Sequence, residues 1–171
     1  MSALASFYLL DSDQLRPLLN AAAPRRHEVR RALGLLKPKV IETYPIHPFL
    51  EEHATRLPTF CDSGWAFVPL ELMLEAQGVS LFRGAALAAE SEQLSAHLKN
   101  SLALFDYARA QALLTQLQAV ALTPNQVTEF LVAEYGEAEP LSVEAVLAAF
   151  RQAQAWLGQV GPHGLGLLWV G

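Results

Sequence analysis

Cysteine, charged residues and long apolar runs are all scarce in this sequence of 171 residues. The one cysteine, Cys61, excludes an intramolecular disulfide framework and a cysteine-rich zinc module. The apolar runs Trp65–Leu70 and Leu165–Val170 fall far short of the ~20 residues that a helix needs to cross a bilayer, so we expect no membrane span and no membrane partner. Only 17% of the residues are charged and 52% are apolar, which excludes intrinsic disorder. We therefore expect a single compact domain over residues 1–171.

The composition also indicates an origin and a compartment. The opening Met-Ser-Ala-Leu lacks the basic region of a signal peptide, and a lone thiol suits a reducing compartment. Nine arginines against three lysines, together with many alanines and leucines, are typical of a bacterium with a GC-rich genome. We expect a bacterial, cytoplasmic protein.

The net charge of −5 is spread unevenly along the chain. Residues 1–40 hold seven basic and three acidic side chains, a balance of +4, and residues 85–150 hold eight acidic and two basic ones, a balance of −6. The basic cluster, densest over residues 25–39, could form a phosphate-binding patch, or the solvated face of a helix, or a segment that meets the acidic one in the fold. We expect no nucleic-acid partner, because the domain is acidic overall and its arginines are not interleaved with aromatic residues.

The two ends of the chain carry the clearest strand patterns. Residues 3–10 and 165–170 are short runs that would be apolar on both faces of a strand, and residues 39–46 are a further candidate. Helical spacing, caps and breakers predict helices over 13–22, 24–36, 48–56, 65–77, 90–104, 106–120, 124–136 and 143–158. The fold class that follows is α/β, of the α+β type, with a small sheet that includes the N- and C-terminal strands and is covered by several helices.

Several side chains are predicted to cap these helices. Thr123-Pro124-Asn125-Gln126 has the pattern of a capping box with proline at the first helical position. Asp11 to Asp13 offer caps to the first helix, and Ser142 offers one to the last. Asp62 or Ser63 can cap the helix that carries Trp65, and of the two we expect Asp62 to do so. We also expect the Trp65 ring to be largely buried.

Motifs of known chemistry are missing from the sequence. It contains no G-x-S-x-G, P-loop or HExxH pattern, so we expect no cofactor and assign no catalytic residue. The glycines from Gly161 to Gly171 precede no helix that could hold a pyrophosphate, which excludes a dinucleotide fingerprint.

One cluster gathers residue types that are common in functional sites. A Cys–His nucleophile pair is one interpretation, and a metal site that uses two histidines with Asp62 or Cys61 is another. Structural roles are the third interpretation and the one we favour, because His47 and His53 are six residues apart and would point to different faces of a helix. The candidate ligand contacts are Tyr44, His47, His53, Cys61, Asp62 and Trp65.

Both ends and one central segment resemble a known family. Phe7–Leu15 is a strand followed by a helix start rich in Asp and Ser, Asp62 to Gly78 is a loop and an apolar helix with Trp65, and Ala149–Gly171 is a helix, a glycine turn and an apolar strand. In this order they resemble the YfbM-like family of small bacterial proteins, a domain of unknown function. The resemblance implies a compact α/β domain and carries no activity. That family often has Leu-His three or four residues after the tryptophan, whereas Ala66-Phe67-Val68-Pro69 follows here.

Three functions remain open. The first is a non-catalytic module that binds and regulates another protein, as small acidic immunity-type proteins do. The second is a small hydrolase or a ligand- or metal-binding protein with its site in the Tyr44–Trp65 region. The third is a homo-oligomeric structural domain that covers an apolar patch on a second copy. We favour them in this order.

Overall fold

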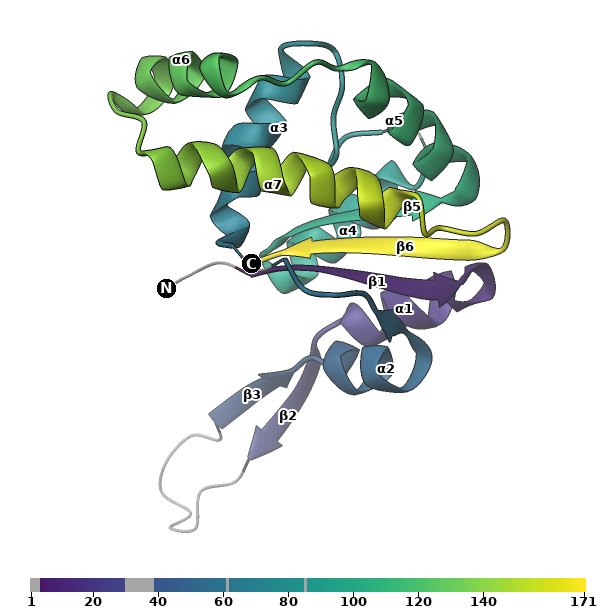
Figure 1. Ribbon diagram of the computed structural model, residues 1–171. Helices are drawn as coiled ribbons and strands as arrows, with labels where there is room; N and C mark the ends of the chain where they lie inside the picture. Colours follow the sequence, from purple (N-terminus) through teal and green to yellow (C-terminus); the bar gives the residue numbers. More distant parts are fainter. Residues whose placement is uncertain (1–3, 30–38, 61, 85) are drawn as a thin grey trace.

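Two buried strands, one from each end of the chain, form the centre of the fold (Figure 1). The computed structural model describes residues 4–29, 39–60, 62–84 and 86–171. Strand β1 (Ala5–Asp11) pairs antiparallel with β6 (Gly164–Val170) over its whole length. The short β4 (Thr55–Arg56) and β5 (Ser101–Asp106) complete an antiparallel sheet of order β4-β1-β6-β5. The prediction that the terminal strands share one sheet is confirmed.

Helices cover both faces of this sheet, which explains why its central strands are apolar on both sides. Leu165 and Leu167 of β6 pack with one group of helices, and Leu168 and Val170 pack with the other. The first group is α1 (Leu15–Ala22), α2 (Ile46–His53) and α4 (Ala88–Leu98), and the second is α3 (Phe67–Glu75), α5 (Tyr107–Ala119), α6 (Pro124–Tyr135) and α7 (Pro140–Leu157). The predicted mixed α/β class is confirmed (Figure 1). Within the described residues, every helix is too short or too polar to cross a bilayer.

Local signals placed several helix ends correctly. The capping box at Thr123 is complete: its backbone N–H donates to Oε1 of Gln126 at 2.9 Å, and its side chain accepts from the backbone N–H of Gln126 at 3.4 Å. Gly136 ends α6 with a φ of 84°, a value that glycine adopts without steric cost. Asp106 caps α5 by accepting from the backbone N–H of Arg109 at 2.7 Å.

The basic segment near the N-terminus departs from the prediction. Where a helix was expected over 24–36, the described part, Arg25–Val29, is strand β2, paired with β3 (Lys39–Thr43); the rest lies outside the described residues. Arg26 bonds Glu42 across this hairpin at 2.9 Å, a cross-strand partner that local helix signals cannot reveal. The hairpin projects from the end of the molecule opposite α6 (Figure 1), so its described residues lie away from that acidic helix.

The strand β5 was also predicted wrongly, as the end of a helix over 90–104. Leu102 and Phe105 match helical spacing by coincidence, and pairing with β6 decides their conformation. The chain leaves α4 at Lys99, whose φ is 56°.

The caps predicted at Ser142 and at Asp11 to Asp13 are not formed. Ser142 lies inside α7, which begins at Pro140 with Glu139 before it, because a proline suits the first helical position. At the first helix, Asp11 makes no side-chain cap bond, and Ser12 and Asp13 lie inside a short 3-10 helix, η1 (Ser12–Gln14), that leads into α1.

A column of aromatic rings joins the sheet to α7 and α3. The ring of Phe7 lies 6.0 Å from that of Phe105 and 5.6 Å from that of Trp156, and Trp156 lies 5.9 Å from Phe67. Gly166 leaves the space for the Phe7 ring, because a Cβ at this position would lie 2.6 Å from Cζ of Phe7 and 2.9 Å from Cγ2 of Val160.

We predict that Gly166→Ala destabilises the protein by ~1–3 kcal/mol, the usual cost of overpacking a core. Strand propensity alone predicts the opposite sign, because it favours Ala over Gly. The change in stability is measured as the difference in the free energy of unfolding in urea. Gly161→Ala is the matched control, since nothing lies within 4 Å of its added Cβ. Phe7→Leu should lower the cost of Gly166→Ala, and an additive double variant would contradict the explanation.

Candidate functional site

The structure divides the candidate residues from the sequence between two places. Tyr44, His47 and His53 lie on or beside α2, on the side of the sheet opposite α3 and α7 (Figure 1). The His47 ring stacks on Trp169 at 5.3 Å, and the His53 ring lies 4.7 Å from that of Phe49. The Tyr44 hydroxyl donates to Oε2 of Glu42 at 3.4 Å. These three side chains therefore have partners of their own.

Asp62 and Trp65 lie on the other side, where two expectations were wrong. Ser63 caps the short 3-10 helix η2 (Gly64–Ala66), its hydroxyl accepting from the backbone N–H of Trp65 at 3.3 Å, so Asp62 is not the cap. Trp65 is 45% exposed rather than buried. Cys61 lies outside the described residues.

The exposure of Trp65 follows from its neighbours. Gly64 and Ala66 are buried, and a Cβ on Gly64 would lie 2.6 Å from the carbonyl carbon of Leu4 and 2.7 Å from the backbone nitrogen of Ala5. This close backbone contact takes the inner side of η2 and leaves the indole ring on the outside.

The described side chains do not assemble a metal site. No three His, Cys, Asp or Glu side chains among them stand in an arrangement that could hold a metal ion.

The helix that follows Trp65 is apolar on more sides than its packing needs. Phe67, Leu70 and Leu74 of α3 are fully buried, whereas Val68 and Leu72 are 46% and 39% exposed. Trp65, Val68 and Leu72 recur at the spacing of one helix face. We call these three side chains the α3 stripe.

The α3 stripe continues onto α6 and α7. The Trp65 ring lies 5.4 Å from that of Tyr135, which is 41% exposed at the end of α6. Trp65 also lines a hollow of about 220 Å³ together with Leu141, which at 76% is the most exposed large apolar side chain described. Exposed apolar groups that gather in this way mark interaction sites more often than scattered ones do.

An open groove of about 670 Å³ runs along the other side of the α3 stripe, between α3 and α4. Phe67, Val68 and Leu72 form its apolar wall, and Ser91 and Ser95 of α4 stand opposite. The two serines are engaged with the edge strand β5: Ser91 Oγ accepts from the backbone N–H of Leu104 at 3.0 Å, and Ser95 Oγ accepts from that of Leu102 at 3.1 Å. They replace a fifth strand and so protect the edge of the sheet.

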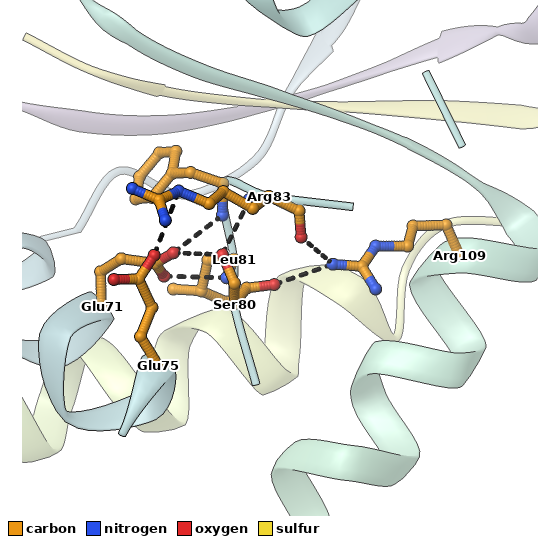
Figure 2. A network of polar contacts seen from close by, with 7 residues as sticks. Glu71, Glu75, Ser80, Leu81, Arg83 and Arg109 are labelled. Carbon is orange, nitrogen blue, oxygen red and sulfur yellow. Dashed lines mark hydrogen bonds and ion pairs between the residues drawn. The ribbon is translucent and has the colours of Figure 1, made fainter. Parts of the chain in front are cut away.

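The loop that closes the end of this groove is held by one carboxylate of α3. Glu71 accepts a hydrogen bond from the Ser80 hydroxyl, one from the backbone N–H of Leu81 at 2.8 Å, and one from that of Phe82 at 3.4 Å (Figure 2). Beside it, the carboxylate of Glu75 pairs with the exposed Arg83 at 3.3 Å.

Arg109 of α5 holds the same loop from its other side. Its guanidinium donates to the carbonyl oxygen of Ser80 at 2.8 Å and to that of Arg83 at 2.7 Å (Figure 2). Gly84 leaves room for it, since an added Cβ would lie 2.6 Å from the guanidine Nε. Burial lowers the pKa of Arg109, and the carboxylates of Glu71 and Asp106 oppose that shift, so the side chain stays charged.

Comparisons with known proteins support the fold and do not identify a function. No protein-family model and no curated protein matches the chain. Among solved structures, the chain is similar to the crystal structure of a protein of unknown function, YfbM from Escherichia coli. The two are 16% identical with a TM-score of 0.50, over 98% of this chain and 99% of that one. The likeness supports a YfbM-like fold, in agreement with the resemblance seen at both ends of the sequence.

We predict that Glu71→Ala loosens the loop over residues 79–84. The variant leaves the partly buried N–H groups of Leu81 and Phe82 without their acceptor, which typically costs ~1–3 kcal/mol. Hydrogen exchange of these two amides should accelerate. Glu75→Ala is the control, because its pair with exposed Arg83 is worth only ~0–1 kcal/mol. Equal exchange rates in the two variants would refute the role of Glu71.

Proposed function

We propose that this chain is a non-catalytic protein-binding module that regulates its partner, in the manner of small immunity-type proteins. The observation that carries the proposal is the α3 stripe, Trp65, Val68 and Leu72, exposed side by side and continued by Tyr135 and Leu141. Aromatic residues are enriched at the centres of protein interfaces, and large apolar anchors supply most of their binding energy.

The α3 stripe is also preorganised for binding. Its backbone is fixed on the inside by the contact of Gly64 with Leu4 and Ala5, and by the burial of Phe67, Leu70 and Leu74. A rigid face loses little conformational entropy on association, so more of its contact energy appears as affinity.

The net charge of the chain bears on the class of partner. A domain of net charge −5 repels phosphate backbones and anionic lipid surfaces, so we propose a protein partner in the bacterial cytoplasm rather than nucleic acid or membrane. A homo-oligomeric domain, with a second copy of the chain on the same face, is the alternative to this function.

A ligand-binding protein is the second candidate function, and the groove between α3 and α4 favours it. Its volume of about 670 Å³ lies in the range of small-molecule sites. A ligand in this groove would lie beside Val68 and Leu72 rather than across the whole Tyr44–Trp65 region. Ser91 and Ser95 are weak candidates for a hydrolytic nucleophile there, because both already bond the backbone of β5.

We predict that a photo-crosslinking amino acid at position 68 captures a discrete partner protein in the organism of origin. The same group at position 41 is the matched control, because Ile41 is 39% exposed on the hairpin at the opposite end. Leu72→Ser should weaken binding of the purified partner about tenfold or more, the effect of losing an anchor, with the melting temperature nearly unchanged.

Other outcomes would contradict this function. Crosslinks only between copies of the chain would assign the α3 stripe to a homo-oligomer contact. A small molecule that raises the melting temperature, with no crosslinked protein at position 68, would favour the ligand-binding function instead.

A further inference from the structure

The hollow between Trp65 and Leu141 has walls of two kinds. Trp65, Ala66, Leu141 and Ala145 supply apolar surface, and Asp62 lies at its margin with two serines. Leu141 and Ala145 are four residues apart on α7 and therefore lie on the same helix face. The hollow is thus a small recess with both apolar and polar lining groups, one of them a carboxylate.

Four more carboxylates lie close in the chain to residues beside this recess. Glu137 and Glu139 are in the turn that leads from α6 to Leu141, and Glu144 is one helical turn beyond it. Glu134 neighbours Tyr135, and partial burial together with this carboxylate raises the pKa of the Tyr135 hydroxyl, which stays neutral at physiological pH. We call Asp62, Glu134, Glu137, Glu139 and Glu144 the acidic rim.

Among the residues that the structure describes, no cation pairs with the acidic rim. All five carboxylates are exposed, and none of them pairs with a basic side chain in the part of the chain that the structure describes. Residues 110–150 contain neither lysine nor arginine. The described part of the basic hairpin, β2 and β3, lies at the opposite end of the molecule (Figure 1). The acidic field at the recess is therefore left for a partner to neutralise.

We propose that the recess binds a basic segment of the partner protein, with one large apolar side chain in the hollow and lysines or arginines on the acidic rim. The inference rests on the proposed function and adds the chemistry of the partner. The hollow, at about 220 Å³, suits a single anchor side chain rather than a whole helix face. Unpaired carboxylates near the exposed Trp65 and Leu141 match a partner segment that has cations beside an apolar anchor.

The acidic rim also argues against a second copy as the occupant. A two-fold contact places the same patch on both sides of the interface. Two copies of the acidic rim would then share one interface, where like charges repel each other. A basic partner segment gains attraction from the same groups.

Three labelled helical peptides test the proposal with the full chain. The first alternates leucines and lysines along one face, the second has alanine in place of leucine, and the third has glutamate in place of lysine. Fluorescence anisotropy at low and physiological salt gives each affinity. We expect only the leucine–lysine peptide to bind well. Its affinity should fall as the salt concentration rises, because salt screens exposed charges.

Two double variants locate the binding. Glu139→Gln/Glu144→Gln should lower the affinity for the leucine–lysine peptide about tenfold, because it removes attraction at the rim. The single variant Leu141→Ser should lower this affinity about as much, because it removes the anchor contact. Glu51→Gln/Glu52→Gln on α2 is the matched control, since it removes the same charge from two exposed positions elsewhere. The control should bind like the wild type.

Each alternative result overturns the inference. An equal loss of affinity in the two double variants would mean that net charge alone attracts the peptide. If the alanine–lysine peptide binds as tightly as the leucine–lysine peptide, no apolar anchor contributes to binding. Failure of the wild type to bind the leucine–lysine peptide also overturns it. If position 68 still crosslinks a partner in any of these cases, the proposed function stands and only the partner's chemistry is wrong. A dimer in sedimentation that Leu141→Ser dissociates would assign the recess to a second copy.

Discussion

The contact of the Phe7 ring with Gly166 is the constraint on which the rest of the structure depends. The two residues lie on neighbouring central strands, and the missing Cβ lets the ring stand between Phe105 and Trp156. Trp156 then fixes the distance of α7 from the sheet and stacks on Phe67, which fixes α3. Because Phe67 is held on the inside, Val68 and Leu72 are turned outward. The packing of the core thus decides which side of an apolar helix faces solvent.

An exposed apolar stripe on a helix is usually covered by a neighbouring segment of the same chain. Here the nearest loop, residues 79–84, is fastened to α3 by Glu71 and to α5 by Arg109, so that it forms the end of the groove and does not cover the stripe. Both anchors are charged groups that bond backbone, and such hydrogen bonds are stronger than those between neutral groups. The position of the loop is therefore set by specific polar contacts as well as by apolar packing.

The sequence predicted those elements whose signal is local or whose environment is uniform. The terminal strands are apolar on both faces, and the capping box at Thr123 needs only its own four residues. Strands β2 and β5 were missed because their conformation comes from distant partners, Glu42 for Arg26 and β6 for Leu102. The cluster from Tyr44 to Trp65 is close in sequence, but the sheet passes between its two halves. The exposed side of Trp65 had one detectable signal: α3 carries more apolar positions than a single packing stripe can bury.

The same elements explain why the charges of the chain stay apart. The sheet and its helices separate the hairpin with Arg25 and Arg26 from the turn between α6 and α7, and Arg26 is already paired with Glu42 (Figure 1). A molecule with separated charge orients an approaching charged partner before contact, which raises the rate of productive encounters. A basic segment would be drawn to the end that carries Leu141 and Trp65, where the apolar anchor contact can form. Steering and anchoring would then act at one place, although they arise from different residues: exposed carboxylates set the approach, and the aromatic column of the core sets the surface that is reached.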